Sequence, residues 1–253
     1  MSFSVRAGDY DRFMGRYSVP LATPFIEFAG VSPGQHVLDV GCGPGALTAE
    51  LARRVGEAAV SAVDPSERFV DAVRERHPGV RVECASAEEL PFEDDSFDVS
   101  LAQLVVHFMN DPAAGIREMA RVTKKHGVVA ACVWDHAGAQ GPLSLFWDVA
   151  RRLDPELEGE SLLAGTRQGD LEELFQEAGL IEVNDTAITV QVEHPSFEEW
   201  WDPFLLGVGP AGAYTVGLDP EKQARLRNLC KEALPEAPFT VSATAWAARG
   251  LPV

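Results

Sequence analysis

LDVGCGPG, residues 38–45, joins an apolar run to a segment with helical periodicity, and the prediction of the fold starts from it. Gly41 allows a tight turn, Gly43 lets a ligand approach the backbone, and Gly45 opens the following helix. The same letters also fit a purely structural glycine-rich turn, and the spacing from Gly41 to Ala46 fits a degenerate dinucleotide fingerprint. The stretch therefore predicts a strand–turn–helix unit whose function depends on the rest of the chain.

Further apolar runs with little alternation lie on both sides of this turn, as expected of parallel strands that are covered on both faces. Amphipathic segments separate the runs, and one of them follows Asp111-Pro112, a helix cap with proline at the first helical position. Such alternation implies right-handed βαβ units and a doubly wound α/β sheet. Strands are predicted at 36–40, 60–64, 80–84, 97–102, 128–134, 181–192 and 239–248.

The second half of the chain has a different pattern. A capping box, Asp170 to Glu173, predicts a helix that ends at Gly179, and Asp219-Pro220 predicts the start of another. Two long insertions, 135–166 and 193–218, contain glycine and proline stretches and large aromatic residues. Connections of this length are often functional lids, so both are expected on the side where a substrate binds.

Composition limits the class of protein. With 253 residues, 46% of them hydrophobic, the chain is predicted to form a single domain over 1–253. An N-terminal helical lid is also expected at 1–30, on separate grounds from composition. The net charge of −18 disfavours nucleic acid, because an acidic surface repels phosphate backbones. We expect a cytoplasmic protein without a membrane span, since no apolar run approaches the ~20 residues required and no cysteines form a CxxC pair. The oligomeric state is left open.

Asp64 ends the second predicted strand, where a carboxylate can accept hydrogen bonds from two ribose hydroxyls. This feature does not separate NAD from S-adenosylmethionine. The stretch SAEELPFEDDSFDVSLAQLVVHF, residues 86–108, is more discriminating. It combines an acidic loop, a Leu-Pro-Phe turn, a strand entered through Phe97-Asp98 and a polar exit that ends in His107.

Taken together, VLDVGCGPG, AVDPS, SAEELPFEDDSFD and DPAAGIREMARVTKKHGVV resemble the class I S-adenosylmethionine-dependent methyltransferases. The likeness is strongest to the small-molecule group that includes the ubiquinone and menaquinone C-methyltransferases. The segment YDRFMGRYS, residues 10–18, is similar to the leading helix of that group. The motifs cover about residues 8–134, and the coarse element order agrees to the C-terminus. The resemblance implies a Rossmann-like, mostly parallel seven-stranded sheet with the last strand antiparallel, plus helical lid insertions. It also implies methyl transfer from S-adenosylmethionine to a small-molecule acceptor.

The resemblance assigns roles to the turn and to the second strand. Asp39 and the 41–45 loop face the methionine part of the cofactor, and Asp39 holds its ammonium directly or through water. Cys42 belongs to this loop but is expected only to fill space. Asp64, with Pro65 and Ser66 beside it, holds the ribose.

The adenine is expected beside Ser86, Ala87 and Glu88, with the Ala87 N–H offered to a ring nitrogen. The sequence departs from its relatives here, since many carry Asp where this chain has Ser86. A hydroxyl makes the weaker contact, and Glu88 is a candidate to compensate. Gln103, at the end of the fourth strand, is expected near the sulfonium or the methionine amine.

Several residues have two interpretations. His107 is a candidate general base for the acceptor, or a histidine that packs under the lid. Arg16 and Tyr17 could clamp the cofactor carboxylate, or be a surface arginine and a core tyrosine. The aromatic residues of the second insertion could line an apolar acceptor pocket, or form the core of a cap helix; these are Trp200, Trp201 and Phe204.

No metal is expected, because no His/Asp/Glu cluster has convincing ligand spacing along the chain. Aromatic residues in both insertions suggest an apolar or aromatic acceptor, while the methylated atom (O, N, S or C) is left open. A cofactor-binding regulatory module and a non-methylating S-adenosylmethionine enzyme remain alternatives, because fold and cofactor motif do not determine the reaction. A nicotinamide oxidoreductase is disfavoured by residues 86–98.

Overall fold

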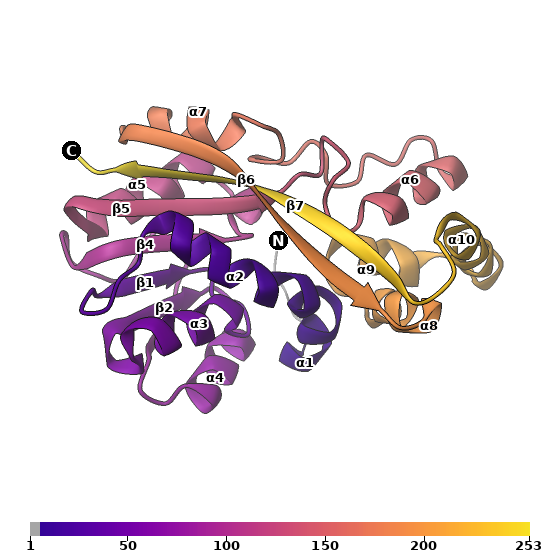
Figure 1. Cartoon of the computed structure of the whole chain (residues 1–253), viewed down its shortest axis with the longest axis horizontal. Coiled ribbons are helices and arrows are strands. Elements are labelled where there is room, and N and C mark those ends of the chain that lie inside the picture. Colours follow the sequence, from indigo (N-terminus) through magenta and orange to yellow (C-terminus); the bar gives the residue numbers. More distant parts are fainter. Residues whose placement is uncertain (1–5) are drawn as a thin grey trace.

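Seven strands form one sheet in the order β3-β2-β1-β4-β5-β7-β6 in the computed structural model, which describes residues 6–253 (Figure 1). β7 pairs antiparallel with both of its neighbours, and the other described pairs are parallel. The predicted mostly parallel sheet with an antiparallel last strand is therefore confirmed. The strands are β1 (Val37–Val40), β2 (Val60–Asp64), β3 (Arg81–Cys84), β4 (Phe97–Gln103), β5 (Thr123–Trp134), β6 (Ile181–His194) and β7 (Phe239–Leu251).

β5 begins earlier than its apolar pattern predicted. Its first residues, 123–127, include the exposed Lys125 and His126, whereas Val129 to Trp134 are buried. The sequence pattern marks only the part of the strand that lies in the core, because the polar part extends beyond the helices that cover it. The strand ends, which position the site, were predicted to within a few residues.

Helices cover both faces of the sheet (Figure 1). One face carries α2 (Arg16–Ala29), α3 (Ala46–Val55) and α4 (Glu67–Arg76), whose apolar side chains share one core with the strands. The other face carries α5 (Pro112–Val122) and α7 (Asp170–Glu177) over a second core. This is the two-sided burial that the near-continuous apolar strands predicted.

The N-terminal segment expected as a lid divides into two parts. α2 packs on the sheet through fully buried side chains such as Leu21, Phe25 and Ile26, so it is a layer of the fold. α1 (Ala7–Tyr10) and the π-helical turn η1 (Asp11–Gly15) precede it. Residues 1–5 of the expected lid lie outside the described part of the chain.

The helix starts follow the predicted caps at two sites and depart at a third. The side chains of Asp111 and Asp219 accept hydrogen bonds from the amides of Ala114 and Lys222, each at 2.9 Å, as N-caps do. The predicted capping box of α7 is wrong. Asp170 is the first helical residue, and its carboxylate accepts instead from the amide of Arg167, because the helix starts one residue after Gly169.

The two insertions and the helix that follows them build a core of their own beyond the sheet (Figure 1). Trp200, Trp201 and Phe204 are buried in it, and Phe204 stacks on Phe146 with ring centroids 4.4 Å apart. These aromatic residues therefore form the interior of a helical cap. Its helices are α6 (Ser144–Leu153), α8 (Phe197–Trp201), η4 (Asp202–Leu206), α9 (Gly209–Gly217) and α10 (Pro220–Ala233).

Every helix among the described residues is too short or too polar to span a bilayer.

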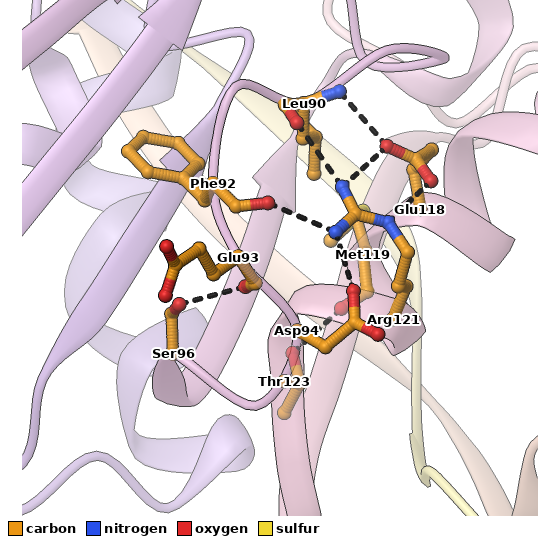
Figure 2. Close-up of polar contacts among 9 residues, drawn as sticks. All are labelled: Leu90, Phe92, Glu93, Asp94, Ser96, Glu118, Met119, Arg121 and Thr123. Atoms are coloured by element: carbon orange, nitrogen blue, oxygen red, sulfur yellow. Dashed lines mark hydrogen bonds and ion pairs between the residues drawn. The ribbon is translucent and has the colours of Figure 1, made fainter.

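Arg121, on α5, holds the acidic loop that precedes β4 (Figure 2). Its guanidinium donates to the carbonyl oxygens of Leu90 and Phe92, at 3.1 and 2.9 Å, and to the carboxylate of Asp94 at 2.8 Å. It also forms a two-point contact with Glu118, which accepts from the Leu90 amide as well. A planar fork with several donors suits this arrangement, so one side chain determines the path of the loop.

We predict that Arg121→Leu lowers the free energy of unfolding by about 2–4 kcal/mol, because charge-assisted hydrogen bonds and two carbonyl partners are lost together. Thermal unfolding monitored by circular dichroism should show a midpoint lower by about 5–15 °C. Arg117→Leu is the matched control, since this arginine lies on the same helix, is half exposed and reaches Asp111 only at 4.0 Å.

The effect of Arg121→Leu should also depend on pH. The hydrogen bonds from Arg121 lower the pKa of Glu118, whose ordinary value is 4.5. A lowered carboxyl pKa stabilises the fold above the ordinary value, and this contribution is lost as the pH falls through the folded-state pKa. The stability difference between wild type and variant should therefore shrink below about pH 4.5. A difference that is constant with pH, or equal losses in both arginine variants, would contradict the assignment.

Candidate functional site

The main cavity, with a volume of about 370 Å³, lies at the carboxyl ends of β1, β2 and β4. β1 separates β2 from β4 in the sheet, so the strand order reverses at this point. Ligands of open α/β sheets bind at such a reversal. The residues predicted for the cofactor that line this cavity are Gly41, Gly43, Asp64, Pro65, Ser66, Ser86, Ala87, Glu88 and Gln103.

Asp64 is the carboxylate around which the cavity is built. One of its oxygens accepts from the amide of Gly43 at 2.9 Å, and the other accepts from the amide of Ser66 at 2.8 Å. Burial raises the pKa of this carboxyl, and the two backbone hydrogen bonds oppose the rise. Asp64 thus links the glycine loop to the start of α4 while still facing the cavity, a linking role that the sequence did not indicate.

The glycines of the loop have separate functions. A Cβ on Gly41 would lie 2.5 Å from both methyl carbons of Val105, so the loop can pack on the turn after β4 only without a side chain there. Gly43 has a φ of +52° and nothing within 4 Å of its Cβ position, which is open toward the cavity that it lines. Gly45 precedes the first residue of α3 in a left-handed conformation, as predicted for the residue that opens the helix.

Asp39 and Cys42 do not line the main cavity but a small neighbouring one of about 20 Å³. Asp39 is buried, accepts from the hydroxyl of Thr48 at 2.6 Å, and has its pKa raised to about 7 by burial. A cavity of this size holds about one water molecule, which favours contact with a ligand through water. The Cys42 side chain packs into the core, as expected of a residue that fills space.

Gln103 lines both the main cavity and the small cavity beside Asp39. Its amide nitrogen donates to the carbonyl of Ser18 at 3.0 Å, and its amide oxygen is buried without a partner among the described residues. A buried acceptor without a partner is costly, and a cationic ligand group would satisfy it. The next residue, Leu104, has a φ of +63°, which is unusual for a residue with a large side chain.

On the other side of the cavity, Ser86, Ala87 and Glu88 lie together as predicted. The carboxylate of Glu88 accepts from the backbone amides of Asn110 and Asp111 at 2.8 and 3.4 Å. Glu88 therefore ties this loop to the turn after η3 (Val106–Phe108), so the carboxylate that was expected to compensate for Ser86 is engaged in holding the wall.

Other residues of the cavity were missed by the sequence reasoning. Tyr10 reaches it from α1 and meets Phe69 edge to face, with ring centroids 5.5 Å apart. The motif YDRFMGRYS, which starts at this tyrosine, was the available signal. The rest of the wall follows Gln103 directly, where only His107 had been considered; it comprises Leu104, Val105, Phe108, Met109 and Asn110.

Arg16 and Tyr17 lie away from the main cavity. The Arg16 guanidinium donates to the carbonyl of Arg12 and forms an ion pair with Glu199 at 2.8 Å. The buried Tyr17 hydroxyl lies 2.9 Å from Nε2 of His194. The polar groups of both residues connect the start of α2 to the helical cap; Tyr17 is a core residue as the alternative predicted, whereas the Arg16 side chain is only 15% exposed and is no surface arginine.

His107 lies on the far side of Leu104 and Phe108 from the main cavity, in a second cavity of about 30 Å³. Burial and the neighbouring His136 hold the pKa of His107 well below its ordinary value. Burial also lowers the pKa of His136 to about 4 and raises the pKa of Glu160, which lines the same cavity, to about 7. The imidazoles are therefore neutral near pH 7.

The main cavity and the second cavity, which His107 lines, adjoin. Tyr10, Leu104 and Phe108 line both of them, so a group at this boundary faces the cofactor side and the histidine side at once. The remaining wall of the second cavity is largely apolar and includes Phe13 and Leu143. Both long insertions contribute to it, the first through His136 and Glu160 and the second through 208–210.

Comparison with known proteins agrees with this geometry. Residues 38–131 match the family model of the methyltransferase domain. A malonyl-[acyl-carrier protein] O-methyltransferase of Halorhodospira halophila is 33% identical over 54% of this chain and 54% of its own length. A ubiquinone/menaquinone C-methyltransferase of Bdellovibrio bacteriovorus is 31% identical over 50% of this chain and 57% of its own. The chain thus spans about half the length of the curated relatives that it matches.

A solved N-methyltransferase of Haemonchus contortus, in complex with phosphomonomethylethanolamine and S-adenosylhomocysteine, has the same fold. Its TM-score is 0.58 at 17% identity, over 97% of this chain and 59% of that one.

We predict that Asp64→Ala weakens S-adenosylhomocysteine binding by about tenfold or more while the protein stays folded, because hydrogen bonds to a charged group contribute about 1.5–3 kcal/mol each. Isothermal titration calorimetry measures the affinity. Asp71→Ala is the control, since this carboxylate lies on α4 and is exposed. A folded Asp64→Ala protein with the affinity of wild type would remove Asp64 from the site.

Gly43→Ala tests the open face of the loop. The new methyl group meets no protein atom within 4 Å and projects toward the cavity, so we expect a large loss of S-adenosylhomocysteine affinity. Gly34→Ala also introduces left-handed strain, of about 1–2 kcal/mol, at an exposed position that has open space and a φ of +90°. The two variants should therefore be similarly destabilised, and only Gly43→Ala should lose affinity. Equal affinities would show that the ligand does not approach this glycine.

Proposed function

We propose that this chain, which carries a class I S-adenosylmethionine-dependent methyltransferase domain, transfers a methyl group from its cofactor to a small-molecule acceptor. The observation that supports this most directly is the junction of the two cavities. The first cavity combines the Asp64 carboxylate, the open face of Gly43 and the unpartnered oxygen of Gln103. The second adjoins it through Tyr10 and carries polar groups of its own.

The residues of the first cavity fit S-adenosylmethionine group by group. The Asp64 carboxylate suits two ribose hydroxyls, because it can accept further hydrogen bonds beside the two that it takes from the backbone. The Gln103 oxygen, together with Asp39 through water, suits an ammonium group. Ser86 and Ala87 offer polar contacts to the adenine. When bound, the cofactor supplies a methyl group activated by its sulfonium.

The chain itself contributes mainly alignment. Loop 41–45 and Asp64 hold one reactant at the carboxyl ends of the strands, and the wall that Leu104 and Phe108 share between the cavities directs the acceptor toward it. Such orientation can supply about 7–11 kcal/mol of a reaction barrier. With both reactants bound, the apolar side chains at the junction would exclude water, which favours transfer over side reactions.

We place the acceptor in the second cavity, whose apolar wall suits an apolar or aromatic molecule. At about 30 Å³ the cavity accommodates about one water molecule, so an acceptor enters only when the wall opens. The parts that we propose to move are η1, which contributes Phe13 and Met14, and the start of α9 at 208–210. These segments, with the two insertions, then act as the lid. The four unpaired cysteines support a cytoplasmic location.

The small size of the second cavity is also the observation that favours a second candidate, a cofactor-binding module without an acceptor. The two proposals differ in turnover, because a module binds S-adenosylhomocysteine and transfers nothing. Calorimetry with S-adenosylhomocysteine and NAD tests the premise that both proposals share. Binding of NAD alone would instead support a nicotinamide oxidoreductase.

The test is a methyl-transfer screen against a small-molecule library, read as release of S-adenosylhomocysteine. We expect turnover with at least one acceptor. His107→Ala should then lower kcat or raise the KM for the acceptor by about tenfold or more, and leave the cofactor affinity within a factor of about two, because His107 lines only the second cavity. His36→Ala, at an exposed histidine before β1, is the control. A loss of cofactor affinity that equals the loss of turnover would contradict this placement.

A further inference from the structure

Three titratable side chains from distant parts of the chain meet in the second cavity. His107 comes from the turn after β4, His136 follows the end of β5, and Glu160 lies between α6 and α7. One potential ligand atom from each lies within 4.8 Å of the other two. All three are buried, at 7%, 8% and 4% exposure.

The polar atoms of this cluster are not satisfied by the protein. The Nδ1 atoms of both His107 and His136 are buried without a hydrogen-bond partner among the described residues. Glu160 accepts from the indole nitrogen of Trp147 at 2.9 Å, and of residues 6–253 no lysine or arginine lines the cavity. Two ring nitrogens without partners, beside a carboxyl group whose one described hydrogen bond comes from Trp147, leave polar atoms unsatisfied, which is costly in an apolar wall.

We propose that His107, His136 and Glu160 form a binding site for one divalent transition-metal ion, with at least one coordination position open toward the cofactor cavity. Two imidazoles and one carboxylate are a ligand set that suits Zn²⁺ and non-haem Fe²⁺. One ion would satisfy the lone pairs of the ring nitrogens and balance the carboxylate charge. The four-coordinate form keeps its fourth position for water or a substrate, as in catalytic zinc sites.

The present spacing is close to that of a loaded site. Ligand atoms on bonds of about 2.0–2.2 Å in a tetrahedral site lie roughly 3.4 Å apart. The three atoms lie within 4.8 Å of one another, so loading would require them to approach by at most roughly 1.4 Å. The Trp147 hydrogen bond already orients Glu160, which is how outer partners hold a ligating carboxylate.

The location gives the ion a use, and this step rests on the proposed function. The cluster lies beyond Leu104 and Phe108, the residues shared with the cofactor cavity. An oxygen of the acceptor, from an alcohol, a phenol or a carboxylate, could occupy the open position and be held toward the junction. Coordination would occupy the lone pair of the His107 imidazole, so His107 would position the acceptor through the metal instead of acting as a general base.

The test uses the full chain without a histidine tag, stripped with a chelator and titrated with Zn²⁺ by calorimetry. Co²⁺ serves as a second probe through its visible absorption bands. We expect one ion per chain, a higher thermal midpoint with Zn²⁺, and intense cobalt bands typical of a low-coordinate site. Glu160→Gln, which keeps an acceptor for Trp147, and His136→Asn should each lower Zn²⁺ affinity by at least about 100-fold, because outer partners alone contribute about 10–100-fold.

His77→Ala is the matched control, because His77 also lies beside a carboxylate, with its Nδ1 atom 3.2 Å from Glu57, but outside the cluster. It should bind Zn²⁺ as wild type does. The proposal is overturned if folded wild type binds no more Zn²⁺ than Glu160→Gln and His136→Asn, or if His77→Ala loses as much. The affinity for S-adenosylhomocysteine is measured in the same samples. Cofactor binding without metal binding would reject the metal site alone, and metal binding without cofactor binding would reject the proposed function alone.

Discussion

The buried carboxylate of Asp64 is the interaction on which the site depends. It accepts from the amides of Gly43 and Ser66, so one side chain fixes both the glycine loop after β1 and the start of α4. The loop in turn packs on Val105, which is possible only because Gly41 has no Cβ. This contact positions the turn after β4. Three strand ends are thus locked together around one cavity, and the negative charge lies where a ligand with hydroxyl groups can use it.

A second charged side chain, Arg121, holds the opposite wall of the main cavity without lining the cavity itself. Arg121 fixes the loop before β4 through two backbone carbonyls and two carboxylates. Glu88 then joins this loop to the turn after η3. Arginine suits the position because its donors diverge in a rigid plane. Hydrogen bonds therefore hold the main cavity on both flanks, whereas a short π-helical turn and parts of the two insertions close the second cavity.

The packing of the helical cap explains why the second cavity is small. Its aromatic residues bury one another instead of facing the junction, and a ring such as Phe204 packs between Phe146 and Trp200. The core of the cap also includes Phe13 of η1 and Phe239 of β7, so the cap packs on both of these elements. Polar groups at its border include those of His107, His136 and Glu160, together with the unpartnered indole nitrogen of Trp134.

The sequence by itself determined the sheet and the position of the cavity at its strand ends. Residues 38–45 and 60–64 could be read directly, because turn chemistry and apolar periodicity depend on neighbours along the chain. The expected places of residues 65–66 and 86–88 came from the resemblance to the methyltransferases. Only the tertiary structure decided that Arg16 and Tyr17 contact the helical cap and that α2 packs on the sheet as a layer of the fold. It also decided that His107 lies beside His136 and Glu160. Such contacts depend on strand order and on how the insertions fold back, and local patterns carry no record of either.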